Sequence, residues 1–573
     1  MDVSAYLELK IAPRAVFDSL PERRSRVRFM VPAGRDWTSV TWGAFAEQIR
    51  EISLFMVSAG VKNGDRATIL APNRVEWMSA ALGIQAIGGV MVPIYPNSTA
   101  DQIGYIVRHS DARVLFVDTP SLLAKIYQAW GDLEGVKKIV LLDEDLDPVK
   151  VLHEQRTKGQ KVPSYAEVEP RVISFANARE IGNALGQEEP TLFDNLMNSV
   201  SLDQFGTMLY TSGTTGPPKG VPLTHRNVAV NGRDWLQNNA SLVDEASVDL
   251  LWLPMSHIFG FGEACLGNTL GFMTYLADPV TALDLLPVVR PNIFMSVPRY
   301  FEKIAQLAMS EKDPERRRRK LSEVTGGRFR FCLSGGAGLK KEVKEFFWEN
   351  GILIIEGYGL TEASPTITLN RPDAFRFDSV GKPLPSLEVK LAEDGEILAK
   401  GESIFSGYHK DPAATQEAFT EDGWLKTGDL GRFTDDGFVQ IIGRKKEILV
   451  TAGGKNISPV NIEDRFMDDP YFAQVVLWGD GEGYLVAGVW PNEAAIVAKL
   501  GDDGMSDEQI HAFLAPRIEK TNAELARYET IKKFVVIREP LTVEAGFLTP
   551  TLKVKRKQVY ATFSDRVMPL YKG

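Results

Sequence analysis

The chain has 573 residues, more than a single hydrophobic core supports, so several domains are expected. Its 65 Lys and Arg residues against 75 Asp and Glu residues give a net charge of −10, which argues against a general nucleic-acid-binding protein. The two cysteines, Cys265 and Cys332, exclude a disulfide framework and indicate a reducing, cytoplasmic compartment. No signal peptide is expected, because the N-terminus carries Asp2 and Glu8 and lacks an apolar segment.

The longest uncharged stretch runs from Trp77 to Tyr95. A membrane span is one interpretation, but the Gly88-Gly89 pair interrupts the stretch. The residues from Asn73 to Glu76 have the pattern of a helix capping box. We therefore predict a buried helix over 74–87 followed by a buried strand over 90–95. Peripheral contact with a membrane is left open.

The pattern of apolar residues indicates an α/β fold. Residues 60–300 alternate short apolar runs with helical patterns, which is the rhythm of parallel sheets covered by helices. Between about 376 and 442, short strands are separated by Gly-centred turns, which predicts a small β-barrel or distorted sheet. A further α/β unit follows Gly443. We expect an N-terminal domain of two parallel-type subdomains and the small barrel over 1–442, and a smaller, mobile α+β domain over 443–573.

The segment from Tyr210 to Gly220 reads Tyr-Thr-Ser-Gly-Thr-Thr-Gly-Pro-Pro-Lys-Gly and has the chemistry of a triphosphate-binding loop. Glycines let backbone N–H groups approach a phosphate, hydroxyls add donors, and Lys219 adds a positive charge. Pro218 and Gly220 exclude a Walker A loop, and a flexible surface linker is the alternative interpretation. The predicted phosphate-binding residues are Thr211, Ser212, Gly213, Thr214, Thr215, Gly216 and Lys219.

This segment resembles the signature loop of the adenylate-forming superfamily, which contains acyl-CoA synthetases, luciferases and the adenylation domains of peptide synthetases. Further motifs of that family follow in the family's order. These motifs are Leu253–Gly260, Leu333–Gly338, Tyr358–Ser364, Thr427–Asp429 and Gly443–Glu447. The resemblance implies ATP-dependent activation of a carboxylic acid.

The second nucleotide motif supplies three side chains with suitable chemistry. Tyr358 is suited to stack on a purine, Thr361 to bind a phosphate oxygen, and Glu362 to coordinate Mg²⁺. The resemblance implies those roles, makes Thr361 and Glu362 catalytic, and adds Thr214 as a second metal ligand. It also implies further nucleotide-binding residues, which are Gly335, Gly336, Ala337, Gly357 and Gly359.

Asp429 lies in a Thr-Gly-Asp run that resembles the family's ribose motif. A carboxylate accepts hydrogen bonds from both ribose hydroxyls, and Arg444 would add a ribose or phosphate contact. Without the other motifs, Asp429 would be interpreted as a turn residue.

His257 lies in the Leu253–Gly260 segment, which resembles the family's acyl-pocket motif. The resemblance implies that His257 contributes to catalysis and lines the acyl site with Phe259, Phe261 and Gly336. The alternative is a buried core histidine beside two core aromatic residues.

Two C-terminal segments carry the remaining roles that the resemblance implies. Lys446, in the Gly443–Glu447 segment, occupies the place of the interdomain hinge. Lys553, in the Leu548–Arg556 segment, is assigned as the catalytic lysine, with Lys555 as the alternative. A basic C-terminal tail is the remaining interpretation of that segment.

The residue before the predicted catalytic lysine departs from the family pattern. Most members have Gly there, whereas this chain has Leu552. The Thr-Pro-Thr-Leu-Lys run instead resembles the long-chain fatty acyl-CoA synthetase branch, as does the segment Thr451–Pro459. That branch implies a loop facing coenzyme A, formed by Gly453, Gly454 and Lys455.

These resemblances imply two half-reactions: a carboxylate attacks Mg²⁺-bound ATP to give acyl-adenylate and pyrophosphate, and a thiol then displaces AMP. A long-chain fatty acid and coenzyme A are the expected substrates. The alternatives are a ligase that loads a separate acyl carrier protein, a phosphotransferase or ATPase, and a catalytically silent ATP- or fatty-acid-binding homologue. No nucleic-acid partner is expected. A cytoplasmic location is expected, and the choice between monomer and homodimer is left open.

Overall fold

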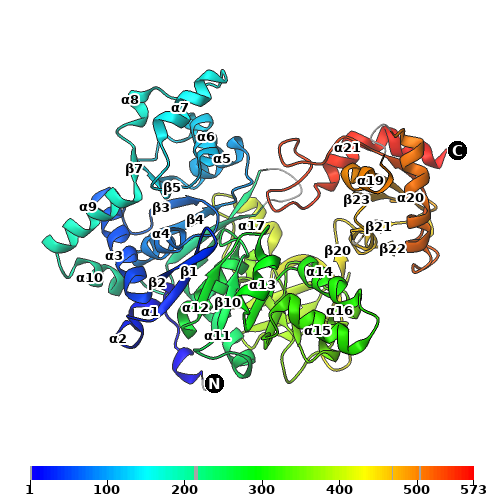
Figure 1. Cartoon of the computed structure of the whole chain (residues 1–573), viewed down its shortest axis with the longest axis horizontal. Helices are drawn as coiled ribbons and strands as arrows, with labels where there is room; N and C mark the ends of the chain where they lie inside the picture. The colour runs from blue at the N-terminus through cyan, green and yellow to red at the C-terminus, as the bar shows by residue number, and fades with distance from the viewer. Residues whose placement is uncertain (1–2, 212–216, 468, 502–504, 573) are drawn as a thin grey trace.

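The structure is a computed structural model that describes residues 3–211, 217–467, 469–501 and 505–572. Figure 1 shows a large body that holds most of the chain and a smaller body formed by its last, orange to red part. This arrangement confirms the predicted α/β fold with a separate C-terminal domain. None of the described helices is both long and apolar enough to cross a bilayer. The boundary between residues 442 and 443 stays a prediction.

The first sheet of the large body has seven strands. In sheet order they are β7 (Val172–Ser174), β6 (Lys138–Leu141), β5 (Ala112–Val117), β3 (Arg66–Leu70), β4 (Val90–Ile94), β8 (Phe205–Thr211) and β9 (Lys219–Thr224). Neighbours from β7 to β8 are parallel, as the alternation of strands and helices predicted. However, β8 and β9 are antiparallel, so the predicted phosphate loop joins a hairpin and does not lead into a helix.

Helix α4 (Val75–Ala86) and the following strand β4 confirm the predicted buried helix and strand. Apolar residues lie on all sides of the helix, so it is buried in a core that receives side chains from both large sheets. The predicted capping box was wrong: the N-cap is Arg74. Asn73 instead exchanges hydrogen bonds of 2.8 Å each with the backbone of Leu253 and Met255. It therefore joins this helix to the segment that carries the predicted acyl motif.

The second sheet has nine strands and is parallel through its middle. In sheet order they are β16 (Lys382–Pro383), β15 (Thr366–Leu369), β14 (Ile354–Gly359), β13 (Phe331–Ser334), β12 (Ile293–Ser296), β10 (Val248–Leu251), β11 (Met273–Leu276), β1 (Val27–Ala33) and β2 (Asp36–Thr41). Helix α12 (Ile258–Leu270) follows β10 and reaches the first sheet's core. There the ring centre of Phe261 lies 6.1 Å from the ring centre of Trp77.

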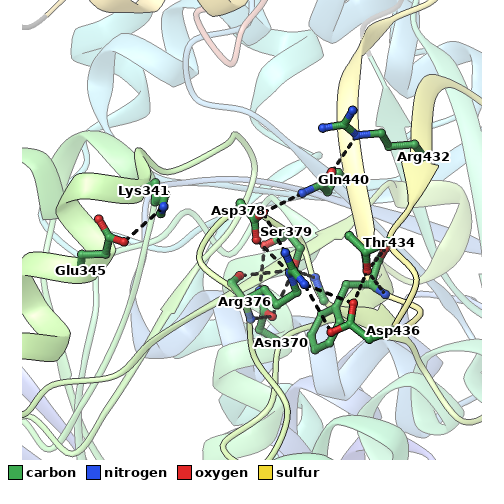
Figure 2. Close-up of polar contacts among 12 residues, drawn as sticks. Lys341, Glu345, Asn370, Arg376, Asp378, Ser379, Arg432, Thr434, Asp436 and Gln440 are labelled. Carbon is green, nitrogen blue, oxygen red and sulfur yellow. Dashed lines mark hydrogen bonds and ion pairs between the residues drawn. The ribbon is translucent and has the colours of Figure 1, made fainter.

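The predicted small β unit is a four-stranded antiparallel sheet. Its strands are β17 (Leu387–Leu391), β18 (Glu396–Gly401), β19 (Leu425–Phe433) and β20 (Val439–Arg444). Figure 2 shows Arg376 between two aspartates. Asp378 lies with Arg376 in the loop after β15, and Asp436 lies in the β19–β20 turn. Its guanidinium nitrogens lie 3.0 Å and 3.2 Å from these two carboxylates. The network thus fixes the β19–β20 hairpin on the edge of the nine-stranded sheet.

The C-terminal domain is built on a three-stranded sheet, β23 (Phe472–Trp478), β24 (Leu485–Pro491) and β25 (Ile531–Val536). Helix α20 (Asp507–Asn522) packs in the core on one face, and helix α21 (Arg556–Val567) packs in a separate core on the other. The loop before α21 carries Lys553 and reaches toward the large body (Figure 1).

His225 makes the stability of the large body sensitive to acid. It begins α11 (His225–Asn239), is 4% exposed, and packs against Gly206. Burial lowers its pKa from 6.5 to about 4. The unfolded chain therefore binds a proton at a higher pH than the folded chain, and the unfolding free energy falls as pH drops from about 6.5 to about 4.

The pKa of His225 differs by about 2.5 between the unfolded and the folded chain. We therefore expect His225→Phe to abolish about 3 kcal/mol of the fall in unfolding free energy between pH 7 and pH 4. Urea unfolding at a series of pH values between 7 and 4 measures it. The exposed His153 provides the control, because His153→Phe should leave the pH slope unchanged. An equal slope in wild type and His225→Phe would contradict the prediction.

Candidate functional site

The predicted phosphate loop is held by the β8–β9 hairpin. Thr211 pairs with Lys219, and Tyr210 pairs with Gly220. The pairing places Lys219 at the first residue of β9, where its ammonium group lies 4.9 Å from the centre of the Tyr408 ring. The predicted phosphate-binding residues Ser212, Gly213, Thr214, Thr215 and Gly216 lie outside the described residues.

Tyr358 and Arg444 meet at Asp429, the predicted ribose residue. The Tyr358 hydroxyl donates to Asp429 Oδ2 at 2.6 Å, and Arg444 Nε lies 3.0 Å from Oδ1. Burial raises the pKa of Asp429, and the charge of Arg444 opposes this shift. Strand β14 therefore presents Tyr358 to a carboxylate on β19, although the two residues are 71 positions apart.

Glycine is required at Gly359, the last residue of β14. A Cβ atom there would lie 1.8 Å from the backbone oxygen of Pro365, so no side chain fits. The tight turn that follows places Thr361 and Glu362 in a short 3-10 helix, η4 (Thr361–Ala363). Gly357, two residues earlier, faces Leu369 across the strand pair, and its nucleotide-binding role stays a prediction.

Glu362, the predicted Mg²⁺ ligand, is 8% exposed and accepts a hydrogen bond of 2.8 Å from the Tyr408 hydroxyl. Burial raises its pKa, while this hydrogen bond and the charges of Arg444 and Lys219 lower it. Sequence reasoning missed Tyr408. Only its place in a Gly- and Pro-flanked loop distinguished it, and such a loop is no signal of a site.

The glycine turn after β13 lies against the predicted acyl motif. A Cβ atom on Gly335 would approach the Phe259 ring to 3.1 Å, so the glycine allows the two segments to meet. Gly336 has a φ of +83°, the left-handed conformation that glycine favours. Gly336 and Ala337 are exposed.

His257 is the N-cap of α12, and its Nδ1 accepts a hydrogen bond from the Phe259 N–H at 3.1 Å. Because Nδ1 accepts, the ring proton of the neutral imidazole lies on Nε2. Burial, and then the charge of Lys553, lower the pKa of His257 to about 4. The imidazole is therefore neutral at pH 7.

The two predicted acyl-site phenylalanines differ in environment. Phe259 is half-buried beside the glycine turn, whereas Phe261 is 1% exposed and packs in the core with Trp77. The acyl-lining role of both residues stays a prediction.

Lys553 belongs to the C-terminal domain, yet its charge acts on predicted site residues of the large body. Its charge lowers the pKa of both Asp429 and His257. The side chain is exposed to solvent, yet enough protein surrounds it for desolvation, followed by repulsion from Arg444, to lower its own pKa. The alternative residue, Lys555, is the N-cap of α21.

The residue before this lysine has a backbone conformation that favours glycine. Leu552 has a φ of +62° and is 62% exposed. A left-handed conformation costs a non-glycine residue roughly 1–2 kcal/mol. The turn is closed by Thr549, whose backbone N–H donates to the Lys553 oxygen at 2.8 Å and whose hydroxyl accepts from the Lys553 N–H at 3.0 Å.

The residues around the predicted hinge differ in how firmly they are held. Lys445 Nζ lies 2.8 Å from Oε2 of the buried Glu396, whose Oε1 accepts from the Gly428 N–H at 2.9 Å. Lys446 follows directly and is exposed. Sequence reasoning missed Glu396, which ties the ribose motif to the residue before the hinge.

The predicted loop facing coenzyme A lies between β21 (Leu449–Val450) and β22 (Asn456–Ile457). Gly453, Gly454 and Lys455 are exposed, and Lys455 lies over the Tyr528 ring in the C-terminal domain. In Figure 1 these strands lie away from the loop that carries Lys553. The role of this loop toward coenzyme A stays a prediction.

Comparisons with known proteins identify related families, sequences and structures. The family model described as "AMP-binding enzyme" matches residues 17–409, and the one described as "AMP-binding enzyme C-terminal domain" matches residues 446–573. A Mycobacterium tuberculosis protein named long-chain-fatty-acid–CoA ligase FadD15 is 32% identical and is matched over 93% of this chain and 92% of its own length. An Arabidopsis thaliana protein named long chain acyl-CoA synthetase 7, peroxisomal, is 28% identical, over 94% of this chain and 82% of its own.

Solved structures share the fold. The adenylation domain of a carboxylic acid reductase from Segniliparus rugosus, in complex with AMP and a co-purified carboxylic acid, superposes with a TM-score of 0.80 at 22% identity. The match covers 98% of this chain and 94% of that one. The anthranilate CoA ligase AuaEII in complex with anthranoyl-AMP gives a TM-score of 0.75 at 21% identity, over 99% of both chains.

Proposed function

This chain belongs to the AMP-binding enzyme family, and we propose that it activates a long-chain fatty acid with ATP and transfers the acyl group to coenzyme A. The choice of acid and acceptor is supported by the names of the M. tuberculosis and A. thaliana relatives. The single observation that supports the proposal is that the charge of Lys553 acts on the pKa of Asp429 and of His257, although the three residues come from three distant parts of the chain.

In the first half-reaction, a carboxylate oxygen of the fatty acid attacks the α-phosphorus of ATP, and the bond to pyrophosphate breaks. Two anions must approach each other, so positioning and charge neutralisation dominate. Asp429 would hold the ribose, Lys219 the outer phosphates, and Lys553 the oxygens of the acid and the α-phosphate. No protein nucleophile is needed.

The donor set at Glu362 fits Mg²⁺. A buried carboxylate supplies the hard oxygen that this ion prefers, and the predicted second ligand, Thr214, would supply another. Mg²⁺ would neutralise phosphate charge when bound. The remaining charge at this place comes from Lys219 and Arg444, both close enough to lower the pKa of Glu362.

In the second half-reaction, a thiol sulfur attacks the acyl carbon, and AMP leaves. We propose that the C-terminal domain first turns about Lys446, which removes Lys553 and brings Gly453, Gly454 and Lys455 to the thiol substrate. The anchored Lys445 and exposed Lys446 support this point of rotation, since motion would begin where side-chain contacts end.

Carboxylate-dependent exchange of labelled pyrophosphate into ATP tests the first half-reaction. Palmitate should support exchange, whereas acetate and an aromatic acid should not, and added coenzyme A should then yield thioester. Exchange without thioester would favour a separate acyl carrier protein as acceptor. ADP as the product would favour a phosphotransferase or ATPase, and nucleotide binding without exchange for any acid would favour a catalytically silent homologue.

A further inference from the structure

Tyr408 contacts two predicted site residues of opposite charge. Its hydroxyl donates to Glu362 Oε1 at 2.8 Å, and its ring centre lies 4.9 Å from the Lys219 ammonium. The first partner follows strand β14, and the second begins strand β9 in the other sheet. Tyr408 therefore bridges the predicted metal ligand and the predicted phosphate-binding lysine.

The loop that carries Tyr408 is fixed on several sides. The Tyr408 N–H donates to Thr415 Oγ1 at 2.9 Å, and the next residue, His409, donates from its N–H to the Gly220 oxygen at 2.9 Å. The Phe405 ring packs edge-on against the Tyr408 ring, with 4.9 Å between the ring centres. The backbone N–H of Phe405 donates to the backbone oxygen of Glu362. These contacts hold the ring in place independently of any ligand.

Lys219 and Glu362 have opposite charges, and both contact the same side chain, Tyr408, which brings them to the same place. Within the ranges that the structure describes, no ion pair of 4.0 Å or less joins them. Lysine has a flexible four-carbon stem and reaches partners readily. In a partly buried place a direct pair would be strong, and separating it would oppose the binding of a phosphate and a cation.

We propose that Tyr408 is a positioning residue that keeps the Lys219 ammonium and the Glu362 carboxylate apart, so that both stay available to a nucleotide triphosphate. The ring face satisfies the ammonium by a cation–π contact, and the hydroxyl satisfies one carboxylate oxygen. Both contacts are weaker than a direct ion pair and yield to a phosphate and a cation. This inference rests on the proposed function, because it assumes that ATP binds between these residues.

Calorimetric binding of α,β-methylene-ATP to the full chain in EDTA tests the inference without turnover. Tyr408→Leu frees both charges to pair, so the affinity should fall about tenfold, equivalent to about 1.4 kcal/mol. Tyr408→Phe keeps the ring over Lys219 and should bind nearly as the wild type does. Tyr484→Leu removes a half-buried, hydrogen-bonded tyrosine of the C-terminal domain and is the matched control, with no change expected.

The decisive comparison is made in a Glu362→Gln background, where no carboxylate can capture the lysine. There, Tyr408→Leu should no longer weaken binding, which a double-mutant cycle measures directly. Equal weakening in both backgrounds, or equal loss with Phe and Leu, would overturn the inference, because it would indicate local collapse. Failure of the wild type to bind the analogue would contradict the proposed function instead.

Discussion

Lys553→Ala is expected to lower carboxylate-dependent pyrophosphate exchange by on the order of 10²–10³-fold, the usual cost of losing one preorganised group that stabilises transition-state charge. The charges of Arg444 and Asp429 act on the pKa of this lysine, and its own charge acts on the pKa of His257, so we expect it to meet the α-phosphate and the acid there. The loss should appear mainly in the rate of exchange, because the lysine acts when charge is redistributed.

The same substitution should leave thioester formation from preformed acyl-adenylate near the wild-type rate. The proposed turn of the C-terminal domain removes Lys553 before the thiol reacts. Lys555→Ala is the matched control, because it removes an ammonium group two residues away and should preserve both half-reactions. Equal loss of the two half-reactions in Lys553→Ala would contradict the assignment, and a larger loss in Lys555→Ala would transfer it to Lys555.

Arg556→Met is expected to destabilise the C-terminal domain by about 3–5 kcal/mol, because it leaves a buried carboxylate without its counter-charge. Arg556 Nη1 and Nη2 lie 2.7 Å and 2.6 Å from the two oxygens of Glu463, and both residues are buried. The Leu477 N–H would remain as a donor to Glu463. Arg556 also begins α21, so its loss should loosen the loop that carries Lys553.

Hydrogen exchange of β23 and β24 measures this effect within the C-terminal domain alone. Arg566→Met provides the control, since the Arg566–Glu539 pair is exposed and should contribute at most about 1 kcal/mol. Pairing Arg556→Met with Glu463→Leu should restore part of the lost stability, because no uncompensated charge then remains. Equal protection in Arg556→Met and Arg566→Met would contradict the prediction, because the buried pair would then contribute no more to stability than the exposed pair.

Several features of the site could be predicted from residue types and their order. Glycines, hydroxyls and one lysine in a row indicate phosphate chemistry whatever the fold, so the segment around Lys219 was identifiable. The buried helix and strand at 75–94 followed from an uncharged stretch interrupted by two glycines. At Leu552, the departure from glycine was visible in the sequence, but its left-handed backbone was not.

Other features depended on contacts between distant segments. Asn73 has the pattern of a helix cap, yet its side chain bonds the backbone of residues 180 and 182 positions away. The phosphate loop follows a strand as predicted, but that strand's partner β9 is antiparallel. Neither outcome has a local signal, because a side chain or strand edge takes whichever partner the packing brings within hydrogen-bond distance.

Residue types and their order are enough to establish the α/β class, the order of the motifs and the chemistry that each motif offers. The contacts of Tyr408 with Glu362 and Lys219, and the link that Glu396 makes from the ribose motif to the residue before the hinge, depend on the packed fold. The two kinds of feature differ because the chemistry of a side chain is intrinsic to its residue type. Its neighbours, its pKa and its freedom to move depend on segments that only the packed core brings together.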